Sequence, residues 1–163
     1  MAADSLPDIG VAVAPILGAT EPERRPLLVA LAERRAAARY REWAAAPELA
    51  RFRSELLACA SREEEIAARI EGLYPAGAAT AIEAESGVAV DRAGEAIFGE
   101  RPLADQLTIQ SRGERLGVAA RRAFARDEPD AHRREVLSSC APLEEESAVT
   151  LDRILRRILA AGF

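Results

Sequence analysis

Four glutamates form two pairs with the same spacing along the chain. Glu33 and Glu63 are 30 residues apart (63 − 33), and Glu114 and Glu144 repeat that separation (144 − 114). Carboxylates brought together in a protein interior are strongly disfavoured, so something must neutralise them. Divalent cations do so directly, and hard oxygen ligands suit iron, manganese or magnesium. The pairs therefore predict metal-binding chemistry if the fold gathers all four side chains at one place.

The glutamates belong to a longer repeat. Residues 56–71 and 137–152 share the pattern Leu-x-x-Cys-Ala-x-x-Glu-Glu-Glu-x-Ala-x-x-(Ile/Leu)-(Glu/Asp), offset by 81 residues (140 − 59). Both cysteines of the chain, Cys59 and Cys140, lie in it. The same offset continues upstream without a gap and aligns Glu33 with Glu114, Arg34 with Arg115, Arg41 with Arg122, and Trp43 with Phe124. The repeat indicates an internal duplication in which each half is a pair of long helices.

Composition and turn residues predict an all-α protein. The chain has 163 residues, of which 49% are hydrophobic and only 4% aromatic, as is typical of helical proteins rich in Ala, Leu, Arg and Glu. Proline and glycine mark the helix limits, so we expect helix pairs over about 25–74 and 102–160. Residues 75–101 would form a long crossover, and residues 1–20 an irregular arm. Residues 21–163 are then one antiparallel four-helix-bundle domain.

Some helix is also expected within the crossover, over 78–85 and 90–98. Its length would let it travel from one end of the bundle to the other, since a 24-residue helix spans roughly 36 Å. Glycines at four positions make this segment less regular than the predicted helix pairs.

A heptad pattern on the second and fourth predicted helices places their core glutamates. In each helix apolar residues recur at alternating three- and four-residue steps, and one glutamate interrupts them. The second helix has Leu49, Phe52, Leu56, Cys59, Glu63, Ile66, Ile70 and Leu73 in this register, and the fourth has Leu137, Cys140, Glu144, Ser147, Leu151, Ile154 and Ile158. Each of the four glutamates lies at a similar distance from its own hairpin turn. We therefore expect all four carboxylates at one level of the bundle interior.

In this arrangement the chain resembles the ferritin-like di-iron carboxylate superfamily, in which two antiparallel helix pairs are joined by a long crossover. Members take one Glu from each of two helices and a Glu-x-x-His from each of the other two. The resemblance implies that Glu33 and Glu114 correspond to the single glutamates, and Glu63 and Glu144 to the motif glutamates. It further implies iron or manganese as the bound metal, with any catalysis oxidative and metal-centred.

The chain departs from this family at both histidine positions, which hold Ile66 and Ser147. The only histidine, His132, precedes Glu144 by 12 residues, about 18 Å along a helix. It cannot serve the same site, and we expect it at the surface. A metal site would then be made of carboxylates alone.

Two alternative interpretations use the same residues. Each triple glutamate also fits an acidic first helical turn, so that a new helix would begin there. Alternatively, the core glutamates pair with Arg34, Arg115 or Arg121, and the metal site is lost. The protein would then be a non-enzymatic structural or partner-binding bundle, so its status as an enzyme stays open. Cys59 and Cys140 are expected to act as small buried hydrophobes.

Charge and hydropathy argue against several classes of protein. The net charge is −5 with both signs interspersed, whereas a nucleic-acid groove needs a basic face. No apolar run approaches the roughly 20 residues of a membrane span. Residues 1–19 contain no basic residue, which makes them a poor signal peptide. We therefore expect a cytoplasmic protein that binds neither nucleic acid nor membrane, and whose exposed helix faces could meet a second copy or another protein.

Overall fold

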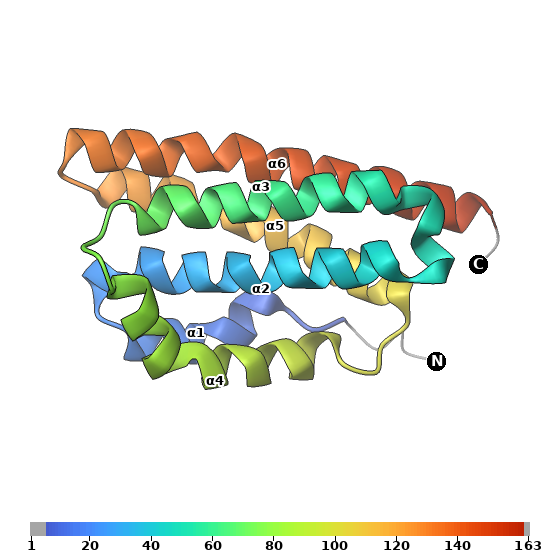
Figure 1. The fold of residues 1–163 in the computed structure, drawn as a ribbon, viewed down its shortest axis with the longest axis horizontal. Helices are drawn as coiled ribbons and strands as arrows, with labels where there is room; N and C mark the ends of the chain where they lie inside the picture. The colour runs from blue at the N-terminus through green and yellow to red at the C-terminus, as the bar shows by residue number, and fades with distance from the viewer. Residues whose placement is uncertain (1–5, 162–163) are drawn as a thin grey trace.

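The computed structural model describes residues 6–161, and this part of the chain is all-α, without strands (Figure 1). Six α-helices follow one another along the chain: α1 Ile9–Ala19, α2 Arg25–Ala45, α3 Arg53–Glu71, α4 Ala78–Phe98, α5 Leu103–Asp127 and α6 Ala131–Ala160. Two short 3₁₀ segments, η1 Pro22–Arg24 and η2 Pro47–Phe52, precede α2 and α3. The all-α fold class is therefore confirmed.

The helices pack mainly as two hairpins. The most extensive helix contacts are α5 with α6 and α2 with α3, and α3 also packs against α6. Figure 1 shows these four long helices running along the length of the molecule, with α1 and α4 forming a further layer beside α2. Helices α2 and α3 lie within residues 25–74 and α5 and α6 within residues 102–160, with η2 Pro47–Phe52 making the turn between α2 and α3.

The N-terminal segment differs from its prediction. Residues 1–20 were expected to be irregular, but Ile9–Ala19 forms α1. The Asp8 carboxylate caps this helix by accepting hydrogen bonds from the backbone N–H groups of Gly10 (2.7 Å) and Val11 (3.2 Å). Pro15 lies inside α1, so the turn signal of a proline is overridden here by packing of the apolar helix on α4 and α5. Residues 1–5 of the predicted arm lie outside the described residues.

The crossover also forms more helix than expected. Instead of two short pieces over 78–85 and 90–98, α4 is continuous from Ala78 to Phe98. Ion pairs hold it to α2: Arg35 binds both Glu83 (2.5 Å) and Asp91 (2.6 Å). Gly87 lies under this contact, because a Cβ there would be 2.5 Å from the Glu83 carboxylate. The glycine that suggested irregular structure instead leaves room for an ion pair between helices.

The triple glutamates lie well inside α3 and α6. Because α3 begins at Arg53 and α6 at Ala131, the interpretation of each Glu-Glu-Glu run as a helix start is wrong. Continuous apolar packing on both sides of Glu63 and Glu144 carries the helices through these residues, including Pro142 in α6. His132 is exposed in the first turn of α6, as predicted.

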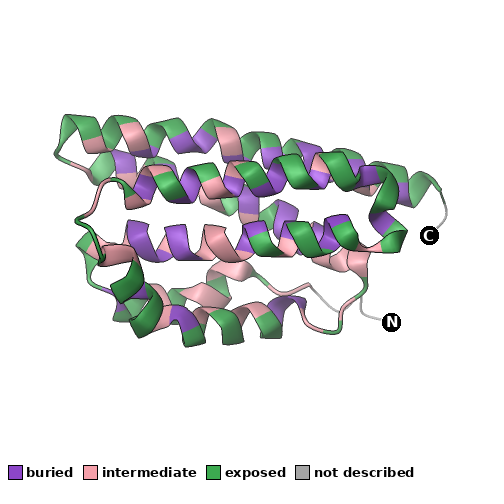
Figure 2. Cartoon of the chain, viewed as in Figure 1, coloured by how far each residue is buried: buried purple, intermediate pink, exposed green. Residues whose placement is uncertain are grey.

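Buried residues line the inner faces of the four long helices (Figure 2). The largest cluster surrounds Tyr40, Trp43, Phe52 and Leu56, and a second one includes Ile66 and Cys140. Both cysteines are buried and free, which agrees with their expected role as small hydrophobes. Within residues 6–161 no helix is both long and apolar enough to cross a bilayer.

Candidate functional site

The four predicted glutamates all face the protein interior. Glu33 lies on α2, Glu63 on α3, Glu114 on α5 and Glu144 on α6. The last three are only 0%, 3% and 1% exposed, and the Glu33 side chain is 12% exposed. The four carboxyl groups, hereafter the carboxylate cluster, influence one another's ionisation, since the charges of Glu33 and Glu114 contribute to the raised pKa of both Glu63 and Glu144. Burial of so much negative charge requires compensation.

A buried arginine supplies part of that compensation. The side chain of Arg121, from α5, is fully buried, and its Nη2 atom lies 2.5 Å from Glu33 Oε1 and 2.7 Å from Glu144 Oε1. The contact to Glu33 is also a hydrogen bond, whereas the contact to Glu144 is an ion pair without hydrogen-bond geometry. The guanidinium therefore lies between a glutamate of each half of the chain.

Of the three arginines proposed as partners of the core glutamates, only Arg121 takes that role. Arg34 pairs with Glu71 on α3, and Arg115 pairs with Asp152 on α6. Both of those pairs lie in more exposed positions, so they contribute little to the carboxylate cluster.

Glu114 is held by neutral donors. Its Oε1 atom accepts hydrogen bonds from the Tyr40 hydroxyl (2.7 Å) and from Gln110 Nε2 (2.8 Å). Gln110 Oε1 accepts in turn from Arg39 Nη1 (2.9 Å). The bonds from Tyr40 and Arg39 cross between α2 and α5, which share few close backbone contacts in the described chain, so polar side chains bridge the space between the two helices.

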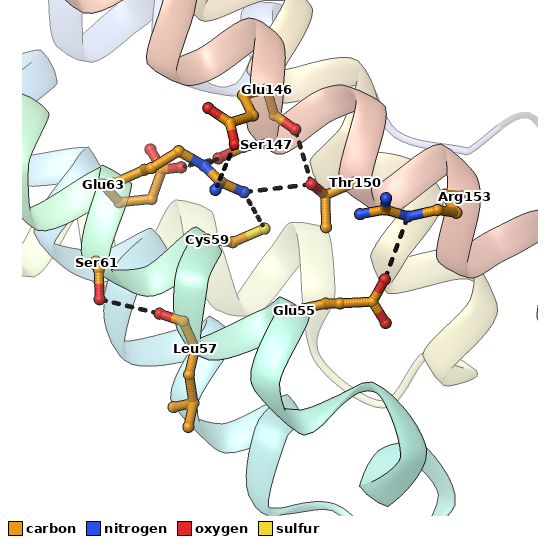
Figure 3. Close-up of polar contacts among 10 residues, drawn as sticks. Glu55, Leu57, Cys59, Ser61, Glu63, Glu146, Ser147, Thr150 and Arg153 are labelled. Carbon is orange, nitrogen blue, oxygen red and sulfur yellow. Dashed lines mark hydrogen bonds and ion pairs between the residues drawn. The ribbon is translucent and has the colours of Figure 1, made fainter.

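Glu63 is held from α6. Its Oε1 atom accepts a hydrogen bond from Ser147 Oγ (2.8 Å), and Arg62 Nε donates to the same hydroxyl (3.1 Å). Figure 3 shows Glu63 and Ser147 facing each other between α3 and α6, with Cys59 and Thr150 nearby. Ser147, three residues after Glu144, is thus engaged by its neighbours, while Ile66, three residues after Glu63, is buried and apolar.

The internal repeat explains how these donors are arranged. Tyr40 and Arg121 are related by the offset of 81 residues (121 − 40), and each lies seven residues after the single glutamate of its own half. Seven residues make two helical turns, so each donor shares a face with that glutamate. Tyr40 donates to Glu114 and Arg121 to Glu33, so each half supplies a donor to the other.

Sequence reasoning named Arg121 only as one of three arginines, and it missed Tyr40 and Gln110 as partners of Glu114. The signal that could have found Tyr40 and Arg121 is their equivalent place in the repeat, two turns after Glu33 and Glu114.

Burial is the main cause of shifted ionisation in the cluster. It raises the pKa of Glu144 to about 9, with the charge of Glu33 adding to the effect and Arg121 opposing it. Burial also raises the pKa of Glu114 to about 7, against the hydrogen bonds from Gln110 and Tyr40, and that of Glu63 well above its ordinary value. Near neutral pH, protons and Arg121 together therefore remove most of the negative charge.

The residues present do not fit a di-metal centre as they are arranged. Among residues 6–161, no three histidine, cysteine, aspartate or glutamate side chains are grouped so that they could hold one metal ion. Arg121 already binds Glu33 and Glu144, and Ser147 already binds Glu63. Iron or manganese ligation by Glu33, Glu63, Glu114 and Glu144 stays a prediction.

A cavity of about 340 Å³ lies over the carboxylate cluster, between α1, α2, α4 and α5. Carboxyl groups of Glu33, Glu114 and Glu144 form part of its wall. The rest of the wall is mostly apolar, and side chains from all four helices contribute to it, among them Ile9, Leu17, Leu28, Val90, Ile97 and Leu116. The helices that sequence reasoning misjudged, α1 and α4, are the ones that cover this cavity.

No known protein family, curated protein or solved structure matches the chain. The carboxylate cluster and the cavity above it bring buried polar groups next to a largely apolar space. They are therefore the basis for inferring function.

Proposed function

We propose that the chain is a ferritin-like four-helix bundle of α2, α3, α5 and α6 that binds a small, largely apolar molecule and needs no metal. The observation that carries this proposal is the position of Arg121, whose buried guanidinium binds Glu33 and Glu144 directly under an apolar cavity. The repeat, the two packed hairpins and the crossover α4 support the ferritin-like assignment.

Arg121 disfavours a metal ion in the same place. A guanidinium stays protonated in proteins, so its charge is permanent. A divalent ion about 4 Å from it would be repelled by about 8 kcal/mol at an effective dielectric constant of 20. The family's histidine ligands, which could offset such a cost, are replaced by Ile66 and Ser147. Burial raises the pKa of Glu63, Glu114 and Glu144, so bound protons share with Arg121 in neutralising the cluster.

The cavity has the properties of a small-molecule site. Its volume of about 340 Å³ falls in the range of roughly 300–1,000 Å³ common for ligand pockets. Such pockets combine apolar walls with a few fixed polar groups, and Glu33, Glu114 and Glu144 provide these here. Apolar ligand surface that leaves water is stabilised by about 25 cal/mol per Å².

Metal binding by the cluster is the second candidate, and one observation favours it. Glu63 Oε2 and both carboxyl oxygens of Glu144 are buried without a hydrogen-bond partner among the described residues. A cation would satisfy these oxygens, provided that Arg121 moved away and the protonated carboxyls released their protons.

Two measurements on the purified protein test the proposal. After expression with added iron and manganese, the wild type should carry no more of either metal than a Glu63→Ala, Glu144→Ala variant by elemental analysis. A neutral apolar probe, octanol, should raise the melting temperature of the wild type, because it binds only the folded state. Ala93→Leu places a larger side chain in the cavity wall and should abolish this rise.

The matched control is Ala89→Leu, one turn earlier on α4 at an exposed position outside the cavity wall, which should keep the response to octanol. A metal content in the wild type that the double glutamate variant loses would overturn the metal-free assignment. An equal response to octanol in both leucine variants would overturn the cavity as the binding site.

A further inference from the structure

One cation in the cavity wall has no acidic partner. Arg39, on α2, packs its guanidinium over the Phe98 ring, with Cζ 3.7 Å from the ring centroid, and donates only to Gln110. Within residues 6–161 it forms no ion pair. Burial lowers the pKa of Arg39 to about 10, so the side chain is still cationic at neutral pH. A largely buried charge without a counterion is costly, which points to an anion supplied from outside.

The other charged groups in the wall are already engaged. Arg35 binds Glu83 and Asp91 on α4. Glu33 binds Arg121, and Glu114 accepts from Tyr40 and Gln110. Glu144 also contacts Arg121.

We propose that the cavity binds a monocarboxylate with an unbranched apolar tail, whose head group lies against Arg39 and Gln110. This inference depends on the proposed function, since it names the class of molecule that the apolar cavity takes. The planar guanidinium suits a carboxylate because two parallel N–H groups can bind its two oxygens. Space beside Arg39 Nη2 is provided by Gly94 of α4, where even an added Cβ would be 3.6 Å away.

The cavity shape agrees with a chain-like tail. Its wall follows α2 from Leu28 to Arg39, which are 11 residues apart and so about 16 Å apart along the helix axis. Ile97 and Phe98 line the end nearest Arg39, and Leu17 of α1 packs near Leu28 at the other end. A head group at Arg39 would thus let an apolar tail follow the wall toward Leu28.

An amine head group fits less well. It would have to bind at the carboxylate cluster, where Arg121 already supplies a cation and would repel a second one. Glu33 lies six residues from Arg39, about 9 Å along α2, so a carboxylate at Arg39 keeps its distance from the glutamate charge. Glu42, three residues after Arg39, is exposed to solvent, which weakens its attraction for Arg39.

The test compares three probes of equal chain length, namely octanoate, octanol and octylamine, by isothermal titration calorimetry on the full chain. Octanoate should bind most tightly. Arg39→Met keeps much of the apolar stem but removes the charge, and should weaken octanoate binding about ten- to hundredfold while leaving octanol binding nearly unchanged. Arg41→Met is the control, because Arg41 is an exposed arginine on the same helix that lies outside the cavity wall, and this variant should keep the preference for octanoate.

The outcomes separate this inference from the proposed function. If octanol binds and octanoate binds no better, or if Arg39→Met weakens both equally, the head-group assignment is overturned and the apolar cavity stands. Tightest binding of octylamine also overturns it, in favour of the carboxylate cluster as the recognition element. If none of the three probes binds the wild type, both the inference and the proposed function are wrong.

Discussion

Replacing Glu144 with glutamine should make the protein more stable at neutral pH and change little in mild acid. In the folded state the pKa of Glu144 is raised to about 9, mainly by burial and then by the charge of Glu33, from an ordinary value of 4.5. Between these values the folded protein holds a proton that the unfolded chain has released. Stability must therefore fall as the pH rises through that interval.

The size of the change in stability follows from the shift in the pKa of Glu144. One carboxyl loses about 1.4 kcal/mol of stability for each pH unit in the interval, or about 3 kcal/mol between pH 5 and pH 7. Glutamine has nearly the same shape and cannot ionise, so Glu144→Gln removes this loss. Because burial also raises the pKa of Glu63 and of Glu114, part of the slope should remain in the variant.

Urea denaturation followed by circular dichroism, from about pH 5 to pH 9, would measure these slopes. Wild-type stability should decline across the range, and the two proteins should nearly coincide at pH 5. Glu145→Gln is the control, since Glu145 is exposed next to Glu144 on α6, and it should follow the wild type. The pKa of Glu128 is lowered by a hydrogen bond from the Asp130 backbone N–H, so this residue affects the pH dependence of stability only at more acid pH. A flat wild-type profile, or equal slopes in wild type and Glu144→Gln, would refute the reasoning.

Two further substitutions test how the cluster is packed and hydrogen-bonded. In Gly117→Ala the new Cβ would lie 1.9 Å from Glu144 Oε2, so despite the better helix propensity of alanine we expect a loss of about 1–3 kcal/mol by urea denaturation. Gly18→Ala, with no neighbour within 4 Å, should instead be neutral or stabilising. Tyr40→Phe removes a donor to Glu114, so the pKa of Glu114 should rise above about 7 in an NMR titration, and an unchanged value would contradict the hydrogen bond.

The parts of the fold that could be predicted are those with strong periodicity. The heptad pattern around Glu63 and Glu144 required long helices with one buried face, and both glutamates are buried as that pattern implies. Sequence periodicity did not predict α1 or a continuous α4, because Pro15 and Gly87 are residues that usually interrupt helices. Those residues are tolerated because of contacts with distant segments, which a local pattern does not contain.

Of the candidate site, the sequence pointed only to the four glutamates of the carboxylate cluster. Charge repulsion showed that the glutamates need compensation, and Arg121 was one of the arginines considered for it. Which arginine is buried depends on side-chain direction and on the space between α2 and α5, which helix periodicity does not specify. The cavity could not be predicted from the sequence for a related reason, because it exists only where α1 and α4 cover the carboxylate cluster.

The internal repeat allows the two halves to be compared position by position, and the differences between them bear on function. Arg121 stands where the first half has Tyr40, and Gly117 stands where it has Ala36. The glycine leaves room for the Glu144 carboxyl, which a Cβ would displace, and that carboxyl meets the guanidinium of Arg121. These two differences act together, since the arginine would lose one of its two acidic partners if Glu144 were pushed aside. A site for two equivalent metal ions would not need these differences between the halves, whereas a site that contains one fixed guanidinium does.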